Sequence, residues 1–180
     1  MTPYQAHRKK WINCTRCPLH SGRSRVVLAR GKVPCDVLFL GEAPGLSEDV
    51  IGQPFVGPAG HLLDKIIEQA IDGRLDYCLT NLVACLPRGD DGDKTKEPPE
   101  DAIEACAPRL IEFVELCRPK LIVLVGKLAR KHIPWELVEK RLWVEIVHPA
   151  AILRMDVSQR GLAVQRCIVT VERTVEEMFS

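Results

Sequence analysis

Apolar and polar positions along this chain follow two patterns, short apolar runs of strand length and apolar residues at helical spacing. Four short, mostly apolar runs have the length of buried strands and cover residues 36–40, 75–83, 120–126 and 142–147. The third run is apolar throughout, which is typical of a central parallel strand covered on both faces. Apolar residues at helical spacing follow over about 62–71, 100–117 and 127–131, and in a closing stripe at Val164, Ile168, Val171, Val175 and Met178.

The alternation of strand and helix predicts the fold class. We expect an α/β protein, a three-layer α/β/α sandwich with a central four-stranded, mainly parallel sheet. A chain of 180 residues can bury a real core, so residues 1–180 are predicted to form a single domain. In this fold the closing stripe packs into the core and is not a partner surface.

The connection between the first strand and its helix is the most unusual stretch. It runs from Gly41 to Gly60 and is far longer than an ordinary connection of this kind. Its five glycines let the backbone turn tightly and approach a ligand. It also carries acidic residues and an aromatic residue, namely Glu42, Glu48, Asp49 and Phe55. These features favour a ligand site over a plain connection, because α/β sheets bind ligands at the carboxyl ends of their strands.

Two further polar residues stand at predicted strand ends. Asn81 lies toward the end of the second strand, and His148 follows the fourth. An Asn can present both a donor and an acceptor to a base edge, although at such a position it is more often a turn or cap residue. For His148 a site role and a capping or core role are equally open. Both residues could meet the long connection in one pocket.

Composition and charge narrow the function classes. The chain has a net charge of +1 and 46% apolar residues, as a soluble globular protein does. A surface that is basic all over is excluded, so binding to DNA requires a local patch of basic residues. Arg23, Arg25 and Arg30 are interpreted as a solvated face and not as a phosphate site. Without a signal-peptide core or an apolar run of ~20 residues, we expect a cytoplasmic protein with no membrane contact.

Eight cysteines are many for a reducing compartment, so a subset is predicted to bind metal. Cys14 and Cys17 have the C-x2-C spacing that can hold a metal centre from a tight turn. A redox pair and two buried thiols are the alternatives. Such a centre needs two further ligands, and Cys85 and Cys106, which bracket a polar loop, could close onto the first pair.

Five segments resemble the family 4 uracil-DNA glycosylases, the iron-sulfur branch of their superfamily. In the family's order, they are CTRCPL, GEAPGLSEDVIGQPFVGPAGHLLD, TNLVACLP, Cys106 and VHPAAILR. The resemblance implies a monofunctional DNA repair enzyme that hydrolyses the N-glycosidic bond of deoxyuridine and leaves free uracil and an abasic site. The alternatives are a DNA-docking module of the same fold and a glycosylase for another deaminated or modified base.

The resemblance also implies a 4Fe-4S cluster that ties down the amino-terminal segment. Its ligands would be Cys14, Cys17, Cys85 and Cys106. Tetrahedral zinc is the chemical alternative. The other cysteines are interpreted as structural thiols, namely Cys35, Cys78, Cys117 and Cys167.

Roles in base recognition follow from the resemblance, because a glycosylase takes its target base out of the stack. Phe55 would stack on the flipped uracil, and Asn81 would pair with its O4 and N3–H but mismatch cytosine. Glu42 would orient the attacking water and stabilise positive charge on the sugar. His148 would donate to uracil O2 as the anion leaves.

The resemblance also assigns the surroundings of the base. The backbone from Gly41 to Gly45, including Ala43, would line the pocket. Glu48 would lie near uracil C5, where bulk excludes the methyl group of thymine. The Gly41-Glu42-Ala43 segment lacks the glutamine of a related group that bonds covalently to uracil, and the insert at residues 88–99 lacks that group's histidine. We therefore expect hydrolytic turnover.

The segment after the histidine resembles the loop that enters the minor groove of DNA. Ile152 or Leu153 would act as the wedge, and Arg154 would hold a phosphate. Lys127 and Arg160 are further phosphate candidates, with a solvated surface as the alternative. The predicted partner is uracil-containing DNA, single- or double-stranded, bound by a monomer.

Overall fold

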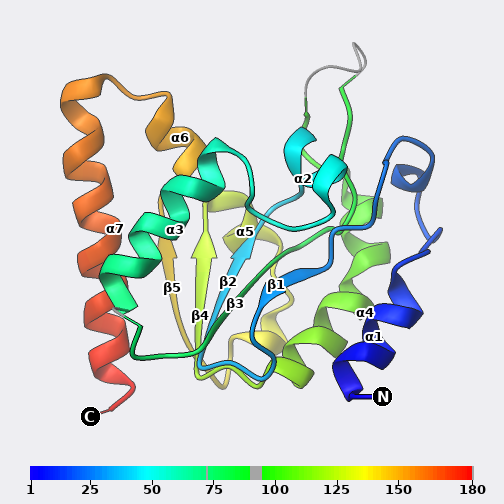
Figure 1. The fold of residues 1–180 in the computed structure, drawn as a ribbon, viewed down its shortest axis with the longest axis horizontal. Coiled ribbons are helices and arrows are strands. Elements are labelled where there is room, and N and C mark those ends of the chain that lie inside the picture. The colour runs from blue at the N-terminus through cyan, green and yellow to red at the C-terminus, as the bar shows by residue number, and fades with distance from the viewer. Residues whose placement is uncertain (72, 90–94, 180) are drawn as a thin grey trace.

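The computed structural model describes residues 1–71, 73–89 and 95–179. Within this part of the chain, a mixed five-stranded sheet has the order β1-β3-β2-β4-β5 (Figure 1). Strands β2 to β5 are parallel, and β1 pairs with β3 in the antiparallel sense. The strands are β1 Ala29–Gly31, β2 Val37–Gly41, β3 Tyr77–Asn81, β4 Leu121–Val125 and β5 Leu142–Ile146.

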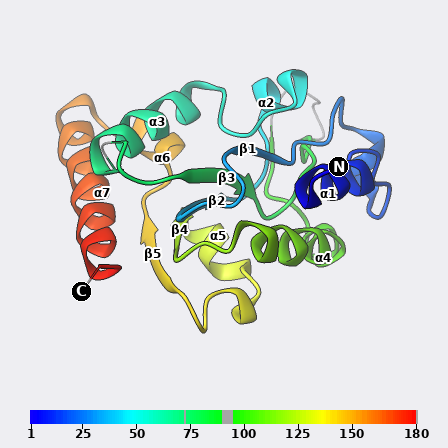
Figure 2. The same ribbon diagram turned by 60° about the horizontal axis from the view of Figure 1, so that its bottom comes forward.

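Helices cover both faces of the sheet, as Figures 1 and 2 show. One face packs against α3 Pro58–Ile71, α6 Pro149–Leu153 and α7 Val157–Glu177. The other face packs against α4 Glu100–Cys117 and α5 Lys127–His132, and α1 Pro3–Trp11 packs on α4. Not one of the described helices combines the length and the apolar character that a membrane span requires.

The four predicted strands and the predicted helices are all present, but the sheet has an additional strand at one edge. All five residues of β4 are buried, as expected of a central strand. On α7 the apolar stripe packs into the core, where Val171 is fully buried. The described sheet has a fifth strand, however, so the prediction of four strands is wrong. The additional strand, β1, has only three residues with Arg30 at its centre, which is too short and too polar for an apolar pattern to predict.

The sequence pattern also does not predict α1, because most of its residues are polar. Its start has a local signal nonetheless. The Thr2 hydroxyl accepts a hydrogen bond from the Gln5 backbone, and the Gln5 side chain accepts one from the Thr2 backbone. His7 on this helix is buried, and its Nδ1 lies 2.8 Å from Glu112 Oε1 on α4. This packing holds the segment just before Cys14 against the rest of the fold.

The long connection after β2 contains a short helix, α2 Leu46–Ile51, beyond the carboxyl ends of the strands (Figure 1). The helix ends at Gly52, whose φ of 83° lies in the left-handed region. The buried Asp49 carboxylate accepts hydrogen bonds from the backbone N–H groups of Ser24 and Arg25. Arg88 Nη2 also donates to it, at 3.3 Å. These contacts anchor the connection to its neighbours.

The parallel strands end at one edge of the sheet, and this edge gathers the predicted site residues. Gly41, the last residue of β2, lies opposite Asn81, the last residue of β3. Strand β4 leads into Gly126, and β5 leads into His148 at the start of α6. The topology therefore brings residues that are far apart in sequence to the same edge.

Candidate active site

A cavity of about 600 Å³ opens at this edge of the sheet. Its walls come from the connection after β2, the ends of β3 and β5, and the starts of α5 and α6. The predicted site residues that line it are Glu42, Ala43, Glu48, Phe55, Asn81, His148 and Arg154. Two lysines, Lys96 and Lys127, line it as well. The structure therefore brings the predicted base-site residues together around one space.

The side chains of Asn81 and Phe55 both lie close to Gly41. A Cβ atom on Gly41 would lie 2.5 Å from Asn81 Oδ1 and 2.5 Å from the Phe55 ring. Both distances are shorter than real contacts, so a side chain at this position would displace the Asn81 amide or the Phe55 ring. The Asn81 side chain makes no hydrogen bond with the described residues, although the residue is only 3% exposed. Its donor and its acceptor are therefore available to a ligand beside the aromatic ring.

Phe55 has an uncommon backbone conformation, with φ of 57° in the left-handed region. Arg30 on β1 fixes this conformation, because its Nε donates to Pro54 O at 3.0 Å and its Nη2 to Phe55 O at 3.1 Å. Nη2 also donates to Asp64 Oδ1 at 2.8 Å. On the other side, a Cβ atom on Gly60 would lie 1.9 Å from Phe55 O. The interpretation of Arg30 as part of a solvated face is therefore wrong, because its guanidinium binds the backbone that carries the ring.

His148 is both a helix cap and a cavity residue. Its Nδ1 accepts a hydrogen bond from the Ala150 N–H at 3.1 Å, so the proton of the neutral ring is on Nε2. Burial lowers the pKa of His148, and Arg154 lowers it further, so the neutral ring is favoured at pH 7. The ring centroid lies 6.5 Å from that of Phe55. A Cβ atom on Gly126 would lie 3.0 Å from His148 Cβ, so this glycine lets the histidine pack closely. Nε2 is thus a positioned N–H donor.

The Glu42 carboxyl group has a strongly raised pKa. Burial raises it to about 7, and the Glu97 carboxylate contributes to the rise. The two carboxyl groups line a second, smaller pocket together with His132. Glu97 belongs to the acidic insert at 88–99, of which residues 90–94 lie outside the described residues. A carboxyl group that titrates near neutral pH in a cavity is a candidate for catalysis.

Glu48 lines the same cavity, but its carboxylate binds the protein backbone. Oε1 accepts hydrogen bonds from the N–H groups of Val56 and Gly57, each at 2.8 Å. Oε2 accepts one from Gly45 N–H at 3.0 Å. These bonds join the backbone before α2 to the backbone just after Phe55.

The segment after β5 forms the short helix α6. Ile152 is fully buried among the side chains of the core, so it has no surface to offer DNA. Leu153 is half-buried and Arg154 is exposed. Lys127 lines the cavity, whereas Arg160 Nε donates to a backbone carbonyl at 3.0 Å. Of the two wedge candidates, we therefore retain Leu153.

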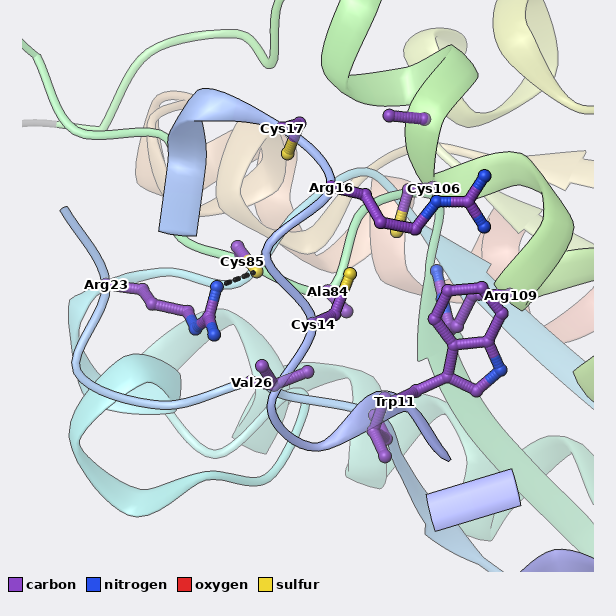
Figure 3. Close-up of a pocket in the computed structure, with 12 residues that line it drawn as sticks. Trp11, Cys14, Arg16, Cys17, Arg23, Val26, Ala84, Cys85, Cys106 and Arg109 are labelled. Atoms are coloured by element: carbon purple, nitrogen blue, oxygen red, sulfur yellow. Dashed lines mark hydrogen bonds between the residues drawn. The ribbon is translucent and has the colours of Figure 1, made fainter. Parts of the chain in front are cut away.

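A separate pocket, the four-cysteine pocket, gathers the predicted metal ligands Cys14, Cys17, Cys85 and Cys106. They come from the turn after α1, the segment after β3, and α4. Figure 3 shows their sulfur atoms turned toward the space that they enclose. Among the described residues, no three His, Cys, Asp or Glu side chains are arranged to hold a single metal ion.

Basic side chains also line the four-cysteine pocket. Arg23 Nη1 donates to Cys85 Sγ at 3.5 Å (Figure 3), and Arg16 and Arg109 contribute to the walls. Burial raises the pKa of Cys85 to about 11, and Arg23 opposes this rise. Four thiols with positive charges around them are a donor set that fits an iron-sulfur cluster bound by thiolates.

The remaining cysteines lie in the core. Cys35, Cys78 and Cys117 lie between the sheet and α4, where hydrogen bonding to the first two, together with burial, raises the pKa of Cys117. Cys167 is buried on the opposite face, with Sγ 3.9 Å from Val147 O. Their apolar surroundings are those expected of structural thiols.

The sequence does not point to three residues that shape these sites, namely Arg30, Gly126 and Arg109. Both arginines are built into the fold, whereas an arginine is usually exposed. Gly126 has a weak signal, because a glycine directly after a buried strand often marks a close approach of the backbone.

At the carboxyl edge of the sheet lie a carboxyl group of raised pKa, an aromatic ring and an amide that has no hydrogen-bond partner among the described residues. This set can bind a flat polar ring and is a candidate enzyme site. Residues 29–169 match the uracil DNA glycosylase superfamily, and the chain belongs to this superfamily.

More particularly, the chain is similar to curated type-4 uracil-DNA glycosylases. It is 34% identical over 163 residues to the one from Pyrobaculum aerophilum, covering 79% of this chain and 80% of the relative. It is 33% identical to that of Sulfurisphaera tokodaii, covering 81% of this chain and 74% of the relative. The identity to that of Archaeoglobus fulgidus is 30%, over 79% of each chain. The family resemblance stated from the sequence segments is thereby confirmed.

Proposed function

We propose that this chain is a uracil-DNA glycosylase that hydrolyses the N-glycosidic bond of deoxyuridine in DNA. The observation that carries the proposal is the Glu42 carboxyl group, whose pKa of about 7 is found beside a free amide and an aromatic ring in one cavity. The names of the relatives, type-4 uracil-DNA glycosylases, support uracil as the base.

Base recognition would use three neighbouring residues. A uracil flipped out of the helix stacks on the Phe55 ring. The Asn81 amide donates to uracil O4 and accepts from N3–H, whereas cytosine presents the reversed pattern. Gly41 makes this possible, because any Cβ atom there would collide with both side chains. Glu48 contributes to selection by fixing the backbone on either side of the base site.

Cleavage moves the electron pair of the bond between C1′ and N1 onto the uracil ring. His148 Nε2–H donates to uracil O2, where negative charge develops. The ionised Glu42 stabilises the positive charge left on the sugar and orients a water molecule. The water adds to C1′ and its proton passes to the Glu42 carboxylate. Glu42 then releases this proton to solvent, and the uracil anion takes up a proton from solvent. The products are free uracil and an abasic site.

A 4Fe-4S cluster would be held by the four-cysteine pocket. The pocket would supply the four thiolates that such a cluster takes as ligands, whereas among the described residues no three His, Cys, Asp or Glu side chains are arranged for a single ion such as zinc. The similarity to type-4 relatives and the donor set of the pocket support the cluster. When bound, it ties the turn after α1 to α4 and takes no part in the hydrolysis.

The DNA surface would lie around α6 at the mouth of the cavity. Leu153 is the candidate wedge in the minor groove, and Arg154 and Lys127 are candidate phosphate contacts. We propose that the chain acts on uracil-containing DNA as a cytoplasmic monomer.

The test uses the purified, iron-loaded protein and a labelled oligonucleotide with one deoxyuridine, followed by alkali. Matched oligonucleotides carry thymine, cytosine or hypoxanthine. We expect alkali-sensitive cleavage at uracil alone, and no strand break before alkali if the enzyme lacks lyase activity. In the Glu42→Gln variant, cleavage is lost while DNA binding remains, and Glu68→Gln on the exposed face of α3 serves as the matched control.

Each result separates the alternatives. Cleavage at hypoxanthine as well keeps the mechanism and widens the base preference. DNA binding without cleavage at any base favours a docking module. Unchanged cleavage by Glu42→Gln contradicts the role of this carboxylate.

A further inference from the structure

Arg109 on α4 is a buried arginine, only 1% exposed. Its Nη1 donates to Thr80 Oγ1 at 3.0 Å. Its Nη2 donates to two backbone carbonyl oxygens at the end of β3, Asn81 O at 2.6 Å and Leu82 O at 2.7 Å. Its Nε is buried and has no hydrogen-bond partner within the described chain. Every acceptor of this guanidinium is neutral.

The positive charge of Arg109 lacks a counter-ion among the residues that the structure describes. Other partly buried charges have one, as Arg30 pairs with Asp64 and Asp49 with Arg88. Hydrogen bonds to neutral acceptors offset only part of the hydration that a buried charge loses. A negatively charged group that binds beside Arg109 would supply the remaining compensation.

The four-cysteine pocket is the place where such a charge would bind, because Arg109 is one of the residues that line it (Figure 3). Neutral thiols do not balance a guanidinium. Four thiolates around an iron-sulfur cluster carry net negative charge. Arg109 thus lines the pocket and also binds the backbone carbonyl oxygen of Asn81 through Nη2.

We propose that Arg109 is a positioning residue that connects the cluster to base recognition. The charge of the cluster holds the guanidinium in place, and the guanidinium fixes the end of β3, from which the Asn81 amide projects toward the base. This inference rests on the proposed function. Because Asn81 Oδ1 and the Phe55 ring both lie close to Gly41, a small shift of the strand end changes how the amide meets a stacked base.

The geometry requires arginine and not only a positive charge. A guanidinium is planar, so it can donate to Thr80 and to two carbonyl groups at once while a further N–H faces elsewhere. A lysine would supply the charge and three donors from one nitrogen, and could not reproduce the bonds that Nη1 and Nη2 make from two separate positions. The two properties can therefore be separated by substitution.

The experiment compares Arg109→Lys and Arg109→Met in the full-length, iron-loaded protein. The measurements are iron per chain, the reduction potential of the cluster, and kcat/KM for uracil in an oligonucleotide. Arg109→Met is expected to lose most of its iron, and its remaining cluster to have a more negative potential. Arg109→Lys is expected to keep its iron and a near-unchanged potential, and to lose about tenfold in kcat/KM because the strand end is held less well. Arg173→Met, at an exposed position on α7, is the matched control.

The outcomes decide between the readings. Iron content and potential equal to the unmodified protein in both variants would overturn the proposed charge balance. Full kcat/KM in Arg109→Lys would overturn the positioning role. If Arg109→Met does not fold, the kcat/KM of Arg109→Lys alone tests this role. A merely structural arginine would not move the reduction potential. An unmodified protein that does not cleave uracil would contradict the proposed function, while the iron measurements would still test the charge balance.

Discussion

The base cavity and the four-cysteine pocket differ in how the charged groups that shape them are partnered. In the base cavity the protein partners these charged groups itself, since Glu48 accepts three backbone N–H bonds and Arg30 binds three acceptors, and the neutral Asn81 amide is left for the ligand. In the four-cysteine pocket, Arg109 Nε has no partner within the described chain. The first site is thus shaped by the polypeptide alone, whereas the second becomes complete only when a negatively charged group binds.

This difference predicts which changes affect which property. Substitutions in the base cavity should reduce catalysis and leave iron content unchanged. Substitutions of the cysteines in the four-cysteine pocket should reduce iron content and stability first, and catalysis only as a consequence. Each of the following experiments tests that separation.

After the loss of cleavage in Glu42→Gln, the largest effect on catalysis is expected at His148. His148→Ala removes both the Nε2 donor and the acceptor that caps α6, whereas His148→Asn keeps a good capping side chain but is too short to replace the donor. We expect both variants to lose about 10²–10³-fold in kcat, as when one oxyanion donor is removed. Single-turnover cleavage and iron analysis measure the result. Full activity in His148→Asn would show that His148 acts only as the cap of α6. Loss of iron in either variant would contradict the expected independence of the base cavity from the four-cysteine pocket.

Gly60→Ala should have the next largest effect. The new Cβ atom would lie 1.9 Å from Phe55 O, so the ring must move away from its position beside Gly41. We expect kcat/KM to fall by about 10²-fold, the effect of misplacing a binding group by about 1 Å. Gly161→Ala on α7 is the matched control, because nothing lies within 4 Å of its Cβ position, and it should leave activity unchanged. Equal activity of both variants would contradict the proposed fixing of Phe55.

Cys106→Ser tests the other site. We expect it to lose iron and to unfold at a lower temperature, by about 2–4 °C for each kcal/mol of stability lost, because cofactor binding and folding are coupled. Cys167→Ser, in the core on the other face of the sheet, should keep its iron. Calorimetry and iron analysis measure both. Full iron content in Cys106→Ser would remove this cysteine from the ligand set.

Much of the fold and the site could be predicted from the sequence, for physical reasons. The buried strands and the amphipathic helices leave a clear apolar pattern, and Glu42, Asn81 and His148 stand where parallel strands must end. Segments of other kinds leave no such pattern. β1 is held by pairing with β3, not by apolar side chains, and α1 is recognisable only from its Thr2–Gln5 cap.

The residues that the sequence could not assign are those whose environment is created by tertiary contacts. Arg30 and Arg109 are polar residues, and polar residues are normally exposed. Only the fold shows that one holds the backbone of Phe55 and the other the backbone of Asn81. Likewise, the raised pKa of Glu42 depends on burial and on Glu97, which is 55 residues later in the chain.

The smallest effect is expected from Glu97→Gln, which changes only the pH dependence. Because the catalytic form of Glu42 is the carboxylate, kcat should rise with pH through about 7. Removing the Glu97 charge lowers the pKa of Glu42, though not to its ordinary value, because burial is the larger cause. The variant should therefore be a few-fold more active at about pH 6 and unchanged at about pH 8.

The stability of the protein should respond with the matching sign. The folded protein holds the Glu42 proton more tightly than the unfolded chain, so this residue lowers stability as the pH rises from its ordinary pKa of 4.5 to about 7. Glu97→Gln should reduce that loss, while Glu104→Gln on the exposed side of α4 should not. Rate profiles and unfolding curves at several pH values provide the measurement. An identical profile in Glu97→Gln would mean that burial alone sets the pKa of Glu42, and that the base cavity is insulated from the acidic insert.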